Sequence, residues 1–181
     1  MSQRFEARLS GSGGQGLILA GKILAEAAAI YEDKNATQSQ SYGPEARGGA
    51  SRSEVIISEG DIDFPKATRL DVLLALTQEA CDKYVGDLKE EGMLIADSRS
   101  VKTLPEGDFQ VFTAPIGELA ETTIGKAMTA NMIALGIIVG ATEIVTPSSA
   151  ELAVSGRVPR GSEELNLKAF RLGLQLAKDG S

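Results

Sequence analysis

Six residues near the N-terminus have the composition of a turn that binds a phosphorylated ligand. The segment Gly11-Ser12-Gly13-Gly14-Gln15-Gly16 lies between a short run of alternating apolar residues, 5–10, and an apolar helical pattern, 17–31. Glycines permit a tight turn and let a ligand approach the backbone, and the free N–H groups at the start of the following helix attract an anion. Gly11, Gly13 and Gly16 match the dinucleotide-binding fingerprint, so we predict a ligand-binding turn whose ligand class the rest of the chain must decide.

A second glycine-rich segment carries two charges. It reads Ser41-Tyr42-Gly43-Pro44-Glu45-Ala46-Arg47-Gly48-Gly49-Ala50. Gly-Pro and Gly-Gly pairs interrupt helices and strands, so we predict a loop. The planar guanidinium of Arg47 suits a bidentate contact with a carboxylate or a phosphate. The loop is either an ordinary surface connection or a binding loop. Its candidate site residues are Tyr42, Gly43, Glu45, Arg47, Gly48 and Gly49.

The composition restricts the chemistry of this chain. It has no histidine, which excludes histidine triads and histidine metal sites, and its one cysteine, Cys81, cannot hold an iron–sulfur cluster alone. Cys81 lies in a predicted helix, 78–84, where the simplest interpretation is a small buried apolar residue. Electron carriers for any redox reaction would therefore belong to a partner.

Charge and hydropathy exclude further classes. The formal net charge of −7 argues against nucleic acid and anionic membranes as partners. No apolar run approaches the roughly 20 residues that span a bilayer, and the N-terminal residues lack the apolar core of a signal peptide. We therefore expect a cytoplasmic protein. Its 181 residues, 43% of them hydrophobic, suffice for one domain, 1–181.

Strand and helix patterns alternate along the chain, which predicts an α/β fold of the Rossmann-like type with a mainly parallel sheet. After the first strand and helix, we expect strands at 35–39, 51–58, 70–76, 93–96 and 109–113. A short strand at 61–64 is expected to pair with 51–58 as an antiparallel edge hairpin. A helix cap is expected at Thr77.

The last third of the chain is predicted to be helical, with helices at 116–121, 126–139, from 147 onward, and at 162–178. The second of these is apolar nearly all round, so it lies either in the core or under a partner subunit. Pro147, Ser148 and Glu151 predict a helix start with a capping box. Arg157 and Arg160 fall in a predicted mobile loop, 156–161, where they are either solvated or in contact with phosphate.

The residues after the first helix argue against a dinucleotide. A dinucleotide site needs an acidic residue about 20 residues beyond the glycines, at the end of the second strand, to hold the ribose. Glu32 and Asp33 have suitable spacing, but they precede the predicted second strand. A free-standing NAD- or FAD-binding oxidoreductase is therefore the weaker alternative.

Together, the turn at 11–16 and the loop at 41–49 resemble the gamma subunit of the 2-oxoacid:ferredoxin oxidoreductases. The resemblance covers essentially the whole chain. It extends to Thr129-Ala130-Asn131-Met132-Ile133-Ala134-Leu135-Gly136 and to Asn166-Leu167-Lys168-Ala169-Phe170-Arg171-Leu172-Gly173. The combination of Ser-Tyr-Gly-Pro-Glu with Arg-Gly-Gly is similar to the 2-oxoglutarate and branched-chain members, whereas pyruvate-type subunits more often carry Phe-Gly-Pro-Glu. The sequence of this motif therefore favours 2-oxoglutarate as the substrate.

The resemblance implies a division of labour among subunits. These enzymes decarboxylate a 2-oxoacid to an acyl-CoA, here 2-oxoglutarate to succinyl-CoA, and reduce ferredoxin. Thiamine diphosphate and its magnesium are expected between the alpha and beta subunits, and the iron–sulfur clusters on other chains, with a ferredoxin-like delta subunit as a further candidate partner. This chain is then inactive alone, has no catalytic residue or metal ligand of its own, and self-associates or binds the alpha and beta subunits.

For the two glycine motifs, the resemblance implies a contribution to a shared coenzyme A site. The alternative is a purely architectural subunit whose two loops touch no ligand. Glycines allow the close approach of another protein backbone as readily as that of a phosphate, so both interpretations stay open at the level of the sequence.

Overall fold

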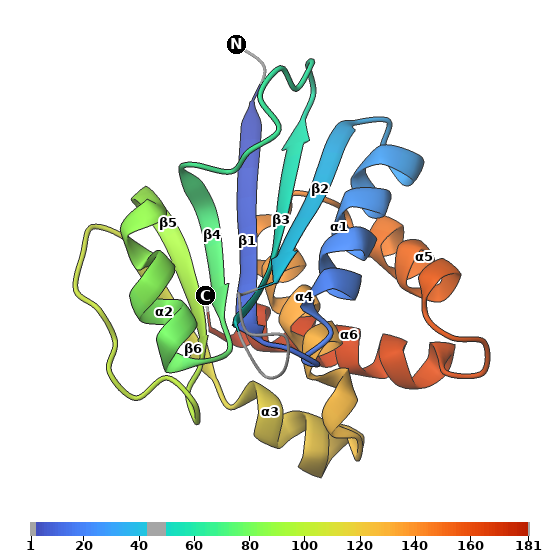
Figure 1. Cartoon of the computed structure of the whole chain (residues 1–181). Coiled ribbons are helices and arrows are strands. Elements are labelled where there is room, and N and C mark those ends of the chain that lie inside the picture. Colours follow the sequence, from blue (N-terminus) through green and yellow to red (C-terminus); the bar gives the residue numbers. More distant parts are fainter. Residues whose placement is uncertain (1–2, 43–49, 181) are drawn as a thin grey trace.

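The computed structural model describes residues 3–42 and 50–180 of the chain. Within this described part, six strands form one sheet in the order β2-β3-β1-β4-β5-β6 (Figure 1). The strands are β1 (Arg4–Ser12), β2 (Asn35–Tyr42), β3 (Ala50–Ser58), β4 (Leu70–Ala75), β5 (Leu88–Asp97) and β6 (Gln110–Ala114). β1, β4, β5 and β6 run parallel to one another, and β3 runs antiparallel between β1 and the edge strand β2. The predicted α/β class with a mainly parallel sheet is confirmed.

Helices cover both faces of the sheet. They are α1 (Leu17–Tyr31), α2 (Gln78–Tyr84), α3 (Ile116–Leu119), α4 (Ala130–Thr142), α5 (Pro147–Arg157) and α6 (Glu163–Asp179). α1, α4, α5 and α6 lie on one side and share a core with apolar residues of β1, while α2 lies on the other side with its own buried cluster (Figure 1). Alternating strand residues therefore enter two separate cores, as a sheet covered on both faces requires.

The edge hairpin is confirmed in kind but is built from different strands. It consists of β2 and β3, whereas residues 61–64 form no strand. Part of the segment before β4 instead supplies backbone acceptors to side chains of β1, since Arg4 donates to the carbonyls of Phe64 and Lys66 at 2.7 and 3.0 Å. β2 extends to Tyr42, beyond the predicted residue 39. An edge strand tolerates its polar composition because pairing with β3 uses backbone groups.

The apolar helix predicted at 126–139 belongs to the core. As α4, it begins at Ala130 after a short 3₁₀ turn, and every residue from Asn131 to Val139 is buried. Gly136 and Gly173 let α4 and α6 cross backbone to backbone, since a Cβ atom on Gly136 would overlap the Phe170 carbonyl oxygen. The middle of α4 therefore packs against α6 at closer range than a residue with a Cβ atom would allow.

Two helix starts show one correct and one wrong prediction. The Thr77 side chain accepts a hydrogen bond from the Ala80 N–H, so it caps α2 as expected. At α5, Pro147 occupies the first turn as expected, but Thr146 is the cap and accepts the Ser149 N–H at 3.1 Å. The predicted capping box from Ser148 to Glu151 is therefore wrong, because the helix cap lies two residues earlier than that pattern implies.

Candidate ligand-binding turn at the end of the first strand

The glycine-rich segment lies at the carboxyl end of the central strand. Gly11 and Ser12 are the last residues of β1, and α1 begins at Leu17, which confirms the predicted order of strand, turn and helix. Gly14 and Gly16 have φ angles of 84° and 75°, in the left-handed region that favours glycine. Ligands of open α/β sheets bind beyond the carboxyl ends of the parallel strands. The turn therefore occupies a position suited to binding.

The Gln15 side chain holds the turn in shape. Its Oε1 accepts a hydrogen bond from the Ser12 N–H at 2.7 Å. A Cβ atom on residue 11 would overlap this oxygen, so any larger residue there would displace the Gln15 side chain from this contact. Above Gly14, by contrast, an added Cβ atom would meet no heavy atom of residues 3–42 or 50–180 within 4 Å. The Gln15 hydrogen bond thus stabilises one side of the turn, and no described residue fills the space above Gly14.

Asn131, in the first turn of α4, lies against the other end of the turn. Its Nδ2 donates to the Gly16 carbonyl oxygen at 3.0 Å, and a Cβ atom on Gly16 would overlap that nitrogen. Asn131 falls in the family-like segment 129–136 but is not among the predicted site residues. The signal was present, since Asn131 is a lone amide at the start of an otherwise apolar helical run.

Strand register brings the residues that bound the second glycine motif to the end of the sheet at which β1 finishes. β1 and β3 pair Ser12 with Ala50 and Gly11 with Ser51, and Ser51 also pairs with Tyr42 of β2. The end of the second motif, Ala50, therefore lies beside Ser12, and its start, Tyr42, lies one strand farther from β1, opposite Ser51. The predicted site residues Gly43, Glu45, Arg47, Gly48 and Gly49, and Pro44 with them, lie outside the described residues, and their roles stay predictions.

Glu32 forms contacts with the start of α5 and with Lys34, and not with a site that could hold a ribose. It follows the last residue of α1, accepts the Thr146 N–H at 2.6 Å and pairs with Lys34 at 3.0 Å. Burial raises the pKa of the Glu32 carboxyl, but the hydrogen bonds from Thr146, Lys34 and Ser149 outweigh it and hold the pKa at about 2. The carboxylate thus stabilises the start of α5, and β2 begins only at Asn35, as the argument against a dinucleotide requires.

The arginines predicted in a loop at 156–161 have ordinary surroundings. Arg157 is the last residue of α5 and forms an ion pair with Glu26 of α1, while Arg160 is exposed. Gly161, with a φ angle of 93°, makes the turn into α6. The predicted loop is therefore shorter than expected, and one of its two candidate phosphate contacts already has a carboxylate partner.

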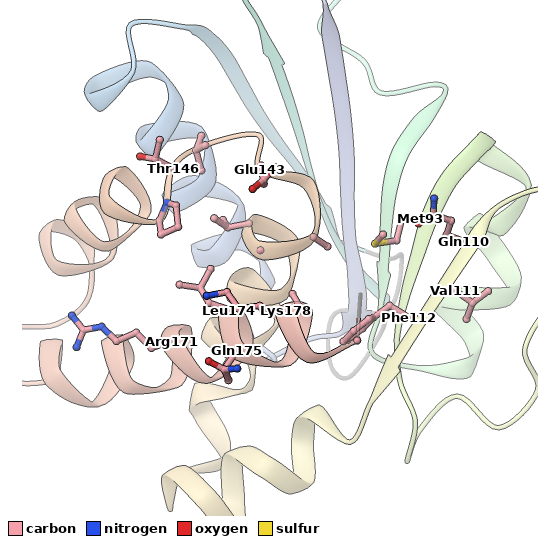
Figure 2. Close-up of a pocket in the computed structure, with 17 residues that line it drawn as sticks. Met93, Gln110, Val111, Phe112, Glu143, Thr146, Arg171, Leu174, Gln175 and Lys178 are labelled. Carbon is pink, nitrogen blue, oxygen red and sulfur yellow. The ribbon is translucent and has the colours of Figure 1, made fainter.

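A hollow of about 880 Å³ lies at a different place, between the start of β6 and the C-terminal ends of α4 and α6 (Figure 2). Met93, Gln110 and Phe112 line it from the sheet, and Leu174 and Gln175 line it from α6. α4 starts at the glycine turn and ends at this hollow, so the helix length separates the two places. None of the described site residues predicted from the sequence lines it.

Residues 3–42 and 50–180 contain no cluster of three or more cysteine, aspartate or glutamate side chains arranged to hold a metal ion. No helix among them is long and apolar enough to cross a membrane.

Comparison with known proteins identifies close relatives. The family described as pyruvate ferredoxin/flavodoxin oxidoreductase matches residues 6–176. The chain is 49% identical to the 2-oxoglutarate synthase subunit KorC of Methanocaldococcus jannaschii, across 99% of this chain and 97% of that protein. It is 46% identical to the protein of the same name from Methanothermobacter thermautotrophicus, across 98% and 97%.

Solved structures share the fold. The gamma subunit of a keto/oxoacid ferredoxin oxidoreductase from Geobacter sulfurreducens superposes with a TM-score of 0.88 at 54% identity, covering 97% of this chain and 99% of that one. A 2-oxoglutarate:ferredoxin oxidoreductase from Magnetococcus marinus, solved with 2-oxoglutarate, coenzyme A and succinyl-CoA bound, gives 0.86. It is 22% identical, covers 99% of this chain and 32% of that chain, and so shows likeness of fold alone.

Proposed function

Since this chain belongs to the pyruvate ferredoxin/flavodoxin oxidoreductase family, as its two glycine motifs predict, we propose that it is the gamma subunit of a 2-oxoglutarate:ferredoxin oxidoreductase. The complex converts 2-oxoglutarate and coenzyme A to succinyl-CoA, releases carbon dioxide and passes two electrons to ferredoxin. The names of two relatives that match nearly the whole chain support 2-oxoglutarate as the substrate. The Ser-Tyr-Gly-Pro-Glu sequence at 41–45 also supports 2-oxoglutarate as the substrate.

In this proposal, the chemistry of decarboxylation and electron transfer belongs to partner chains. Alpha and beta subunits hold thiamine diphosphate and magnesium, and other chains, including a ferredoxin-like delta subunit where present, hold the iron–sulfur clusters. Thiamine diphosphate supplies the decarboxylation chemistry when it is bound there. The present chain contributes a wall of the coenzyme A site and a platform for assembly.

One observation carries the coenzyme A assignment: the strand register pairs Ala50, at the end of the second motif, with Ser12, and puts Tyr42, at its start, opposite Ser51 on the far side of β3. The turn itself fits a phosphorylated group, because α1 begins without a side-chain cap and none of the described residues fills the space above Gly14. Under this hypothesis, the chain binds and orients coenzyme A through backbone N–H groups and Arg47, and none of its residues takes part in the chemical reaction.

The architectural alternative also has an observation in its favour. Gln15 already satisfies the Ser12 N–H, so the turn is stable without a ligand. In this alternative, the open side at Gly14 receives the backbone of a partner chain, and substitutions there impair assembly while leaving the use of coenzyme A unchanged.

A matched pair of glycine substitutions separates the two. Gly14 and Gly161 both have left-handed φ angles, 84° and 93°, and at both a Cβ atom would meet no heavy atom of the described residues within 4 Å. Alanine at either position therefore costs a similar amount, about 1–2 kcal/mol of backbone strain. In complexes assembled with alpha and beta subunits, we expect Gly14→Ala to raise the KM for coenzyme A several-fold, whereas Gly161→Ala leaves it unchanged.

The controls give each outcome a meaning. Decarboxylation of 2-oxoglutarate in the absence of coenzyme A should be equal in both variants, because the turn does not touch the reacting carbon. An unchanged KM for coenzyme A in a fully assembled Gly14→Ala complex would remove the coenzyme A assignment. Failure of Gly14→Ala alone to assemble would favour the architectural subunit.

A further inference from the structure

Asn131 is a polar side chain in an apolar setting. It is 4% exposed and begins a run of nine consecutive buried residues in α4. Its Nδ2 donates to the Gly16 carbonyl, as described above, but its Oδ1 is buried without a hydrogen-bond partner among the described residues. Buried polar atoms are normally paired, so this oxygen needs an explanation.

The observed contacts make Asn131 unfavourable for the stability of the free chain. An unpaired buried acceptor costs about 1–3 kcal/mol. The Gly16 carbonyl also accepts the Ala20 N–H at 3.2 Å, so it would keep a partner if the Asn131 amide were removed. A leucine of similar size would bury the same volume without an unpaired oxygen and has a higher helix propensity. Stability alone therefore does not account for an amide at this position.

The position of the amide points to the glycine turn. The Asn131 side chain contacts Gly16, the residue from which α1 starts without a side-chain cap. Gly14 and Gly16 both occupy the left-handed region, and no described residue fills the space at Gly14, so the described part of the chain leaves the turn room to change shape. Because Oδ1 has almost no accessible surface, a donor that reaches it belongs to the protein and arrives through a movement of the backbone.

We propose that Asn131 is a positioning residue for the coenzyme A-binding turn. Its Nδ2 fixes Gly16 against α4, and its Oδ1 accepts a hydrogen bond from a backbone N–H of the turn at 13–16 once a phosphorylated ligand occupies that turn. The hydrogen bond forms only in the occupied turn, so its free energy contributes to ligand affinity and not to the stability of the free chain. This inference rests on the proposed function, in which the turn binds coenzyme A.

The test compares stability with ligand use in Asn131→Leu. We expect the free variant chain to melt at the same temperature as the wild type or higher, because an unpaired acceptor is lost. In the complex with alpha and beta subunits, we expect the KM for coenzyme A to rise about three- to tenfold, the loss of one neutral hydrogen bond. The kcat and the coenzyme A-independent decarboxylation should not change.

A matched control is Asn166→Leu in the first turn of α6, where the amide donates to the Ser162 carbonyl at 2.9 Å and to its hydroxyl at 3.2 Å. There we expect a loss of chain stability and no change in the KM for coenzyme A. This is the opposite pattern to Asn131→Leu, and it is the pattern of an amide with a purely structural role. The paired measurement therefore separates positioning from structural support.

The outcomes also separate this inference from the function on which it rests. If Gly14→Ala raises the KM for coenzyme A and Asn131→Leu does not, the role of Asn131 is wrong and the turn still binds the ligand. If neither raises it, the coenzyme A assignment fails first. Should Asn131→Leu not fold, Asn131→Ser removes the same amide with less bulk, and an unchanged KM in that variant overturns the role equally.

Discussion

Arg47 is the one cationic side chain of the second glycine motif, and the sequence rather than the structure argues for its role. A guanidinium grips a phosphate through two donors, and the loss of a charge-assisted contact of about 1.5–3 kcal/mol weakens binding roughly ten- to more than a hundredfold. In the assembled complex, Arg47→Ala should therefore raise the KM for coenzyme A by that factor. Arg160→Ala, which removes an exposed arginine outside both motifs, is the control. Equal KM values in the two variants would show that Arg47 contacts no phosphate of coenzyme A.

Glu32 makes a prediction about acid stability. Its pKa lies at about 2, below its ordinary value of 4.5. A carboxyl whose pKa is lower in the folded state stabilises the protein above pH 4.5, and this contribution is lost as the pH falls from about 4.5 to 2. Glu32→Gln should therefore unfold at lower urea concentration than the wild type at pH 6, with the difference shrinking toward pH 2. A difference that stays constant over this range would mean that the charge of Glu32 does not support α5.

At the scale of elements, the crossing of α4 and α6 depends on glycine. A Cβ atom on Gly136 would overlap the Phe170 carbonyl and lie 2.9 Å from the Gly173 Cα, so backbone atoms must move. Overpacking of this kind costs about 1–3 kcal/mol and occasionally more, and we expect Gly136→Ala to lose at least that in urea unfolding. Gly86→Ala, at a glycine with no atom within 4 Å of the added carbon, should stay within about 0.5 kcal/mol of the wild type. Similar losses in both variants would contradict the close crossing.

Local sequence patterns predicted the elements whose signals are local. The apolar run of β4 and the capped start of α2 follow from apolar continuity and from Thr77. The pairing of β3 did not follow, because its partners lie before it in the chain and one of them, β2, is polar. Residues 61–64 have strand-like composition, but they cannot pair with β3, because β1 and β2 already pair with its two edges. Strand partners are a property of the whole sheet, which local composition does not encode.

The same contrast between local and long-range signals applies to the candidate site. The turn at 11–16 was predictable because glycine spacing is a local signal with a direct backbone meaning. The Gln15 brace and the contact between Asn131 and Gly16 were not predicted, since each depends on how a side chain folds back or on how two helices meet. The proximity of the two glycine motifs was expected from resemblance alone. The register of β1 with β3 gives it a physical basis.

At the scale of the whole molecule, the proposed function assigns every redox step to other chains. The chain has no histidine, and its single cysteine is buried in α2. Burial raises the pKa of the Cys81 thiol, and the neighbouring Asp82 raises it further, so the thiolate that would bind metal or attack a substrate is disfavoured. Cys81 thus packs as a small apolar residue in the buried cluster between α2 and the sheet.

The resulting prediction is that the purified chain alone will not reduce a viologen dye with 2-oxoglutarate and coenzyme A, whereas the complex with alpha and beta subunits will. Cys81→Ala, introduced into the chain before assembly, should leave the kcat of the complex unchanged, since a buried thiol with a raised pKa is a poor nucleophile and a poor ligand. Dye reduction by the chain alone would require a redox centre on this chain and would contradict the proposed division of labour. Loss of kcat in a fully assembled Cys81→Ala complex would place Cys81 in the chemistry, since packing of a small side chain affects stability before it affects turnover.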